Sequence, residues 1–188
     1  LEVVNRYIRD EETYRLLDAA PYDYVVDAID TLSPKLALIA AALERRLPLV
    51  SSMGAGAKMD PTKLEIADIS KTHHCPLAHM LRKRLHKLGI RSGFRAVFSP
   101  EPMREGAMIL CEEQNKKSNV GTISYIPALF GIGCASVVIR GLIGELDAPA
   151  PTGAAEPVGP GVRTAPAADS GVQLPDGASL ATNINKTL

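Results

Sequence analysis

The alternation of hydrophobic and polar positions predicts a strand, a helix and a second strand near the start of the chain. An apolar run over residues 24–29 lies between Pro21 and Pro34, as expected of a short buried strand. Residues 34–46 have the helical period, and a second apolar run, 47–50, follows within one crossover length. The apolar positions of the helix are Leu36, Ile39, Ala40 and Leu43. This order predicts two parallel strands joined by a helix, and hence an α/β fold.

The pattern predicts further strands and helices along the chain. Strands are expected at 1–4, 63–69, 94–99 and 107–111. A short helix is expected to open at Arg9, and a longer one at 76–88. Residues 128–146 are apolar or small at almost every position, so we expect a buried helix that a partner subunit shares. Ser33 is expected to cap the helix that begins at Pro34.

Composition separates a globular part, residues 1–147, from a tail. Residues 148–188 are dominated by Ala, Pro, Gly, Thr and Ser, which predicts a disordered C-terminal tail. The 188 residues carry a formal net charge of zero, which excludes a globally basic nucleic-acid coat but not a local patch. The three cysteines lack C-x-x-C spacing, so we expect a reducing, cytoplasmic setting. The longest apolar run is interrupted by Pro127, and we expect no membrane span.

Two carboxylates end the first predicted strand. Asp27 and Asp30 lie where parallel strands of an open α/β sheet usually present ligand-binding groups. A structural role, such as capping the next helix, suits Asp27. Asp30 is followed by Lys35 and, after the next strand, by a loop of small residues that includes Gly54 and Gly56. Such a loop lets the backbone approach a ligand, and Asp30 would then hold Mg²⁺ beside a triphosphate.

The interval between Asp68 and Glu101 contains no acidic residue. The predicted helix at 76–88 is amphipathic and should present a basic face to solvent. Its expected core side is Leu77, Met80, Leu81, Leu85 and Leu88. A solvated charged helix is the ordinary interpretation, but the absence of acids favours a polyanionic partner, RNA or a nucleotide. The candidate RNA-binding residues are Lys71, Arg82, Lys83, Lys87 and Arg91.

The sequence His73-His74-Cys75 suggests a metal site or a nucleophile only weakly. Adjacent histidines on a loop rarely bind one ion, and no second ligand pair is visible. Cys75 precedes Pro76 at an expected helix start, where the thiol pKa can fall. Cys111 and Cys134 lie in apolar contexts and are expected in the core.

Several stretches together resemble a known family. They are 25–35 (VVDAIDTLSPK), 48–56 (PLVSSMGAG), 60–62 (DPT), 68–72 (DISKT) with 76–78 (PLA), and 97–99 (VFS). The chain resembles the TcdA family of tRNA threonylcarbamoyladenosine dehydratases, within the ThiF/MoeB and ubiquitin-activating-enzyme superfamily. The resemblance covers residues 1 to about 145.

The resemblance implies a Rossmann-like mixed sheet flanked by helices, and an enzyme that uses ATP and Mg²⁺. It would adenylate the carboxylate of threonylcarbamoyladenosine in tRNA, which then closes to a cyclic product with loss of water. By this analogy Asp30 serves ATP and Mg²⁺, and Asp30 and Lys35, the basic residue shortly after it, are the expected catalytic residues. A homodimer and sulfur-transfer partner proteins are further implied. The superfamily's glycine-rich nucleotide loop is expected before Leu1, so the 188 residues alone would have weak or no activity.

Two other functions are compatible with the same residues. The alternative enzyme is an adenylyltransferase for a ubiquitin-like or sulfur-carrier protein, although the absence of two C-x-x-C pairs disfavours that branch. A non-enzymatic binding or dimerisation module is the third interpretation. An RNA enzyme needs positive surface, whereas a carrier enzyme needs a groove for a diglycine tail.

Overall fold

The computed structural model describes residues 1–8, 11–102, 108–113 and 116–146, and the side chains of 108–119 lie outside the description. Its helices are α1 (Glu11–Asp18), α2 (Leu32–Glu44), α3 (Pro76–Lys87) and α4 (Tyr125–Leu142), with 3-10 turns η1 (Pro61–Lys63) and η2 (Ile69–Lys71). Its strands are β1 (Val25–Asp27), β2 (Leu49–Ser52), β3 (Glu65–Asp68), β4 (Arg95–Phe98), β5 (Met108–Glu113) and β6 (Lys116–Val120). The predicted α/β fold is confirmed.

The first four strands form a mixed sheet in the order β1-β2-β4-β3. β1, β2 and β4 are parallel, whereas β3 pairs antiparallel with β4 at the edge. β1, α2 and β2 are the predicted strand–helix–strand unit, and the carboxyl ends of the three parallel strands meet at one edge of the sheet. β5 and β6 form a separate antiparallel hairpin. The sequence pattern had indicated β5 but not β6.

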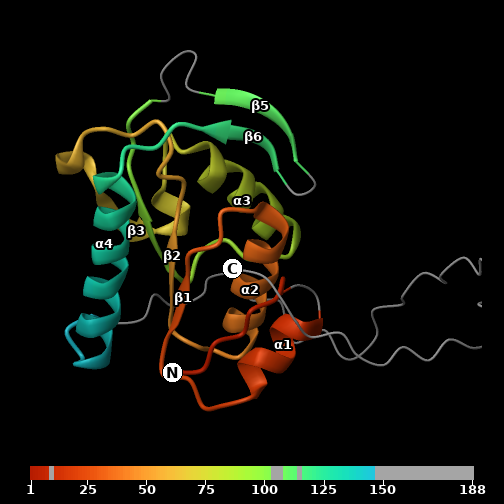
Figure 1. The fold of residues 1–188 in the computed structure, drawn as a ribbon. Helices are drawn as coiled ribbons and strands as arrows, with labels where there is room; N and C mark the ends of the chain where they lie inside the picture. The colour runs from red at the N-terminus through yellow and green to blue at the C-terminus, as the bar shows by residue number, and fades with distance from the viewer. Residues whose placement is uncertain (9–10, 103–107, 114–115, 147–188) are drawn as a thin grey trace, which may run out of the picture. The chain divides into compact units, whose positions relative to one another are not determined.

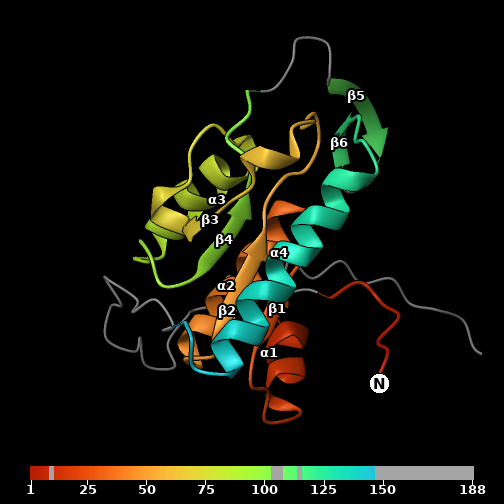
Figure 2. The same cartoon turned by 90° about the vertical axis from the view of Figure 1, so that its left-hand side faces the viewer.

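Helices cover both faces of the sheet (Figure 1). Leu49, Ala96 and Phe98 point to the face where α2 and α3 pack. Val50 and Val97, one residue along in each strand, pack instead under α4. Side chains alternate between the two faces of a strand, and these strands are apolar at consecutive positions because both faces are covered. Figure 2 shows α4 running along the face opposite α2.

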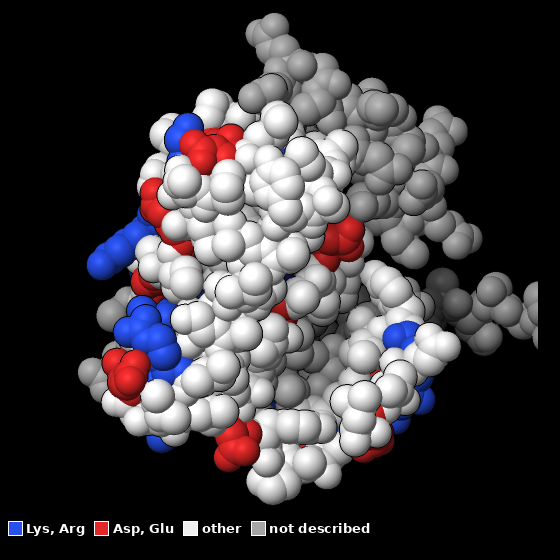
Figure 3. All heavy atoms as spheres, turned by 60° about the vertical axis from the view of Figure 1, so that its left-hand side comes forward, with Lys and Arg blue, Asp and Glu red and all other residues white. Residues whose placement is uncertain are grey.

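Helix α4 is only partly buried within the single chain, and the expectation that a partner subunit shares it stays a prediction. Phe130, Cys134 and Val137 pack onto the sheet, but Ile132 and Ile139 are 65% and 58% exposed. By length and composition alone α4 would be able to cross a membrane, a test that the core helix of a soluble protein also passes. Figure 3 shows that the side of the molecule on which α4 lies is largely uncharged.

Glycines set how closely α4 approaches its neighbours. A Cβ at Gly133 would lie 3.0 Å from a methyl group of Val97, and one at Gly141 would lie 2.9 Å from the ring of Tyr24. The helix therefore rests on the strands at distances that a larger residue would not allow.

Three local predictions differ from the structure. Residues 1–4 form no regular element, and α2 begins at Leu32, with Thr31 rather than Ser33 before it and no side-chain cap bond. On α3, Met80 and Leu88 are exposed, so that Ala78, Leu81 and Leu85 make the buried face. The predicted short helix is present as α1, and the residues at which it was expected to open, Arg9 and Asp10, lie outside the described residues. The predicted tail and the domain boundary at 147 lie outside the described residues.

Candidate active-site cleft

A cleft with a volume of about 800 Å³ opens at the carboxyl edge of the sheet. Its wall is built by the residues that follow β1, by the loop that follows β2, and by the starts of α3 and α4. This is where open α/β sheets bind ligands, because loops diverge there and leave backbone groups accessible. Asp30, Gly54 and Gly56, three residues singled out in the sequence, all line it.

Asp30 contributes an exposed carboxylate to the cleft. It lies three residues beyond β1, in the turn that leads into α2. By contrast Asp27, the last residue of β1, is fully buried and faces away from solvent. The structure thus separates the two carboxylates, as the sequence suggested: one lines the cleft and the other lies inside the protein.

Asp27 is the centre of a buried polar cluster with Lys35 and Ser51. Its Oδ2 lies 2.7 Å from Lys35 Nζ and accepts a 2.5 Å hydrogen bond from Ser51 Oγ. Its Oδ1 accepts a 3.0 Å bond from the backbone N–H of Ile29. Burying a carboxylate is costly unless it is paired and hydrogen-bonded, and here both oxygens have partners. Asp27 is therefore a structural residue that joins β1, β2 and α2.

Lys35 is also fully buried, and its ammonium group bonds to two loops of the cleft wall. Besides Asp27, Nζ donates to the carbonyl of Ile29 at 2.9 Å and to that of Ser52 at 2.7 Å. An ammonium has three N–H donors, so all three are used. Ile29 precedes Asp30, and Ser52 precedes the small-residue loop. Lys35 thus fixes two cleft-lining segments but is not itself part of the lining.

The small-residue loop after β2 packs closely against the end of β6. A Cβ at Gly56 would lie 2.8 Å from Val120, whereas one at Gly54 would meet nothing nearer than 3.7 Å. The next residue, Ala57, has φ of 57°, which is uncommon for a residue other than glycine, and its N–H donates to the carbonyl of Gly121 at 2.8 Å. The loop is therefore held in one conformation beside the cleft.

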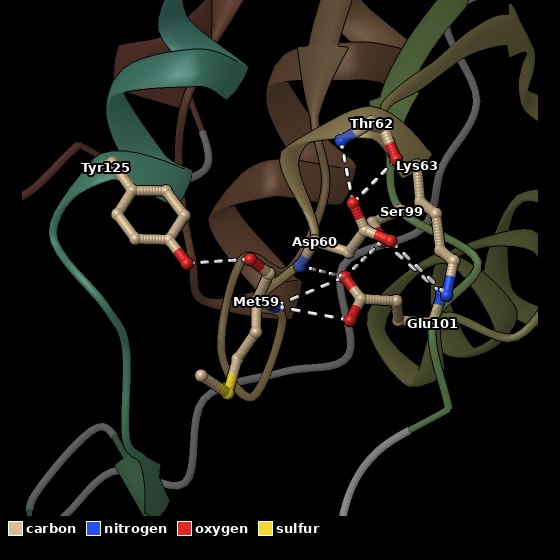
Figure 4. A network of polar contacts seen from close by, with 7 residues as sticks. All are labelled: Met59, Asp60, Thr62, Lys63, Ser99, Glu101 and Tyr125. Atoms are coloured by element: carbon tan, nitrogen blue, oxygen red, sulfur yellow. Dashed lines mark hydrogen bonds and ion pairs between the residues drawn. The ribbon is translucent and has the colours of Figure 1, made fainter.

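A polar network continues from this loop (Figure 4). The Glu101 carboxylate accepts bonds from the backbone N–H groups of Met59 and Asp60, at 3.2 and 3.0 Å, and from Ser99 Oγ at 3.2 Å. Burial raises the pKa of Glu101, but these hydrogen bonds outweigh it and the net pKa is lowered. Tyr125, at the start of α4, donates to the carbonyl of Met59 at 2.7 Å. The network connects the loop to β4 and to α4.

The chain is similar to known tRNA threonylcarbamoyladenosine dehydratases. It is 36% identical to the Bacillus subtilis (strain 168) protein over 145 residues, which cover 73% of this chain and 57% of that protein. It is 32% identical to the Escherichia coli (strain K12) protein over 161 residues, which cover 76% of this chain and 60% of that protein. The crystal structure of E. coli TcdA in complex with ATP matches with a TM-score of 0.65 and 29% identity, over 76% of this chain and 56% of that one.

This chain is a homologue of the TcdA dehydratases. It spans somewhat more than half the length of the relatives that it matches, 57% and 60% for the two proteins named. No protein-family model matches it. The fold of its described part is that of TcdA, and the resemblance inferred from short motifs extends through three-quarters of the chain.

The cleft has one cationic residue that the sequence did not indicate. Lys58 lines the cleft and is 2% exposed, and its Nζ donates to the backbone carbonyl of Glu101. Burial lowers the pKa of Lys58, while the nearby Cys75 and Glu101 oppose that effect. The available signal was a lysine next to a glycine-rich loop, but the sequence does not show whether a lysine at that position faces solvent or the cleft.

Cysteines also lie in this wall. Cys75 and Cys134 line the cleft and are 3% and 4% exposed, and both are free thiols. Burial raises the pKa of Cys134, which keeps it a neutral thiol. The side chain of Cys111 lies outside the described residues. Within the described part of the chain no group of three or more His, Cys, Asp or Glu side chains is arranged to hold a metal ion.

The candidate RNA-binding residues lie mainly on and beside α3. Lys71, Lys83, Lys87 and Arg91 are exposed. Arg82 is different, because its guanidinium donates to the carbonyl of Thr72 at 2.7 Å and also to the Thr72 hydroxyl. Thr72 is buried, so Arg82 anchors the segment before α3 to the helix. A structural role therefore accounts for Arg82, and the other four remain candidates for contact with RNA.

Proposed function

We propose that the protein is an ATP-dependent tRNA threonylcarbamoyladenosine dehydratase. The observation that supports this most directly is the cleft at the carboxyl edge of the sheet, with Asp30 in its wall, in a chain homologous to TcdA. E. coli TcdA has been crystallised with ATP and with AMP, the nucleotides expected before and after adenylation of a carboxylate. We assign the cleft described above to ATP in this protein.

The proposed reaction has two steps. The carboxylate of threonylcarbamoyladenosine attacks the α-phosphorus of ATP, forming an acyl adenylate and releasing pyrophosphate. The activated carboxyl carbon is then attacked from within the same side chain, which closes the ring and releases AMP. The net change in the nucleoside is the loss of one water. Such a reaction needs groups that hold the triphosphate and stabilise negative charge at the transferring phosphorus.

Asp30 is the residue proposed to serve ATP and Mg²⁺. Mg²⁺ is commonly held by one or two carboxylates together with substrate phosphates, and a single exposed carboxylate in the cleft fits that pattern. When bound, Mg²⁺ would neutralise charge on the phosphate oxygens. The backbone of the Gly54 to Gly56 loop lies in the same wall and is available to approach the nucleotide.

Lys35 is proposed to support the reaction through position rather than contact. Its three donors hold Asp27, the carbonyl before Asp30, and the carbonyl that leads into the small-residue loop. It thereby sets the spacing between the proposed metal-binding carboxylate and the proposed nucleotide loop.

The remaining assignments concern partners and setting. We propose that Lys71, Lys83, Lys87 and Arg91 contact the tRNA backbone, since they are exposed lysines and arginines in a segment without acids. We propose a homodimer whose interface is formed by the exposed apolar residues of α4. The proposed setting is cytoplasmic. Sulfur-transfer proteins are proposed as further partners on the resemblance alone.

The test is to incubate the full-length protein, of which the 188 residues are expected to be a part, with ATP, Mg²⁺ and tRNA that carries threonylcarbamoyladenosine, and to measure nucleoside masses after digestion. Conversion of that nucleoside to a product lighter by one water is expected. Unchanged nucleosides, with tRNA binding and ATP binding both intact, would exclude the proposal. Exchange of labelled pyrophosphate into ATP that depends on a carrier protein with a diglycine end, and not on tRNA, would instead identify the alternative adenylyltransferase.

A further inference from the structure

Lys58 is a buried cation in the wall of the proposed ATP cleft. It is 2% exposed, and its Nζ donates to the carbonyl of Glu101. Among the described residues no carboxylate forms an ion pair with it, and Glu101 O is its only hydrogen-bond acceptor. The carboxylate of Glu101 acts on Lys58 through its charge without an ion pair between them. A lysine ammonium has three donors, so within the described structure two are uncommitted.

Lys58 differs from Lys35 in how many of its ammonium donors are bonded. Both lysines are almost fully buried near the same cleft, but all three donors of Lys35 are used by Asp27, Ile29 and Ser52. Lys35 is thus satisfied by the protein itself. Burying an ammonium is costly without an anionic partner. Lys58 lines a cavity where such a partner would fit, and Lys35 does not.

The network of Figure 4 fixes the backbone that carries Lys58. The residues directly after it, Met59 and Asp60, give their N–H groups to the Glu101 carboxylate. The carbonyl of Met59 accepts a bond from Tyr125. The backbone that follows Lys58 is therefore held both by Glu101, just beyond β4, and by Tyr125 at the start of α4. A cation held in place before a ligand arrives loses little conformational entropy on binding it.

We propose that Lys58 is a binding residue for an anionic group of the reactants, either a phosphate of the nucleotide or the carboxylate that is to be adenylated. Both groups carry oxygens that accept from an ammonium, and both belong in this cleft if the proposed function is correct. The inference rests on that function for the identity of the ligand. Its physical basis, a buried and incompletely partnered cation in a cavity wall, is independent of it.

The test compares the wild-type protein with Lys58→Met by calorimetry, using ATP, AMP and adenosine as probes. If Lys58 binds phosphate, the substitution lowers affinity for ATP and AMP about ten- to a hundredfold and leaves adenosine unchanged, as expected for one charged hydrogen bond. Lys63→Met is the matched control: Lys63 lies in the same network but is exposed, pairs with Asp60, and does not line the cleft.

A second set of probes distinguishes the carboxylate. The free nucleoside N6-threonylcarbamoyladenosine carries it, and the methyl ester of that nucleoside does not. If Lys58 binds the carboxylate, Lys58→Met weakens binding of the acid to the level of the ester, and ester binding does not change. Affinities for all five probes within about twofold of wild type, or equal losses in Lys63→Met, would overturn the inference.

Two further variants test the same inference in case Lys58→Met does not fold. Lys58→Arg keeps the charge and should keep most of the affinity, whereas Lys58→Gln keeps a donor without the charge and should lose it. Equal binding by these two variants would also overturn the inference. Binding that depends on Lys58, in a protein that does not dehydrate the tRNA nucleoside, would reject the proposed function but not the role of Lys58.

Discussion

Lys35 Nζ lies 2.7 Å from Asp27 Oδ2, and both side chains have no exposed surface. The pair joins the start of α2 to the end of β1, and Ser51 on β2 completes it. An ion pair in such surroundings is screened little by water, and removing either partner leaves an uncompensated buried charge. The region that supports the cleft therefore depends on both residues being present.

We expect Lys35→Met to lower the free energy of unfolding by about 3–5 kcal/mol, because the Asp27 carboxylate would remain buried without its counter-ion. Urea denaturation followed by circular dichroism measures this. The matched control is Arg45→Met, which breaks an ion pair with Asp18 whose carboxylate is 60% exposed, and which should cost far less in charge interaction because water screens the pair. Similar losses in the two variants would contradict the buried-pair argument.

Asp30→Asn should remove dehydratase activity while leaving the fold intact, because the side chain is exposed in the cleft and the substitution keeps its size. Nucleoside mass analysis gives the activity, and the urea midpoint gives the stability. Asp23→Asn, an exposed carboxylate outside the cleft lining, is the control and should retain activity. Full activity in Asp30→Asn would remove Asp30 from the proposed site.

Gly56→Ala should destabilise the cleft wall, whereas Gly54→Ala should not. The new Cβ at position 56 would lie 2.8 Å from Val120, but at position 54 the nearest atom would be Leu77 Cβ at 3.7 Å, an ordinary contact. Overpacking of this kind costs about 1–3 kcal/mol. Thermal unfolding of the two variants checks the difference, and equal midpoints would show that the loop moves aside at no cost.

Lys83→Glu combined with Lys87→Glu should weaken tRNA binding and flatten its dependence on salt, with ATP affinity unchanged. Both residues are exposed on α3, and every tRNA phosphate that they no longer neutralise lowers the slope of log affinity against log salt by about one unit. Arg15→Glu with Arg140→Glu reverses the same number of charges, on α1 and α4. If this control reduces tRNA affinity as much, net charge rather than the α3 surface explains the effect.

The Glu101 network should make stability depend on pH in the acid range. Although burial raises the pKa of Glu101, hydrogen bonds from Asp60, Met59 and Ser99 lower it below its usual 4.5. Because the folded-state pKa is the lower one, this contribution is present above about pH 4.5 and is lost as pH falls through the folded-state value. The difference in unfolding free energy between wild type and Glu101→Gln should therefore shrink on acidification. A constant difference from about pH 6 to about pH 3 would contradict this.

The sequence pattern was most reliable where a strand or helix buries a long apolar surface. The unit of β1, α2 and β2 followed from consecutive apolar positions, which reflect a sheet covered on both faces. Asp30 was placed at the correct edge because the end of a parallel strand fixes that edge. For α4 the pattern indicated an apolar helix but not how its apolar residues are divided between the sheet and an exposed side. Hydropathy does not distinguish those two surroundings.

The sequence led to the wrong expectation for Lys35, because it suggested that this side chain faces the cleft. Its distance from Asp30 along the chain suggested two side chains facing one ligand. In the structure Asp27 and two backbone carbonyls use all of its donors. Lys58 was missed for the opposite reason, since nothing local indicates that a lysine in a glycine-rich loop is buried and bonded to Glu101, which lies far along the chain.

The sequence by itself determined the parallel βαβ unit, the edge of the sheet where Asp30 lies, and the acid-free segment around α3. These follow from local periodicity and from charges counted along the chain. Only the tertiary structure decided which of the two buried lysines has uncommitted donors and lines the cleft. That depends on contacts between residues as far apart as Lys58 and Glu101, or Lys35 and Ser52, which folding alone brings together.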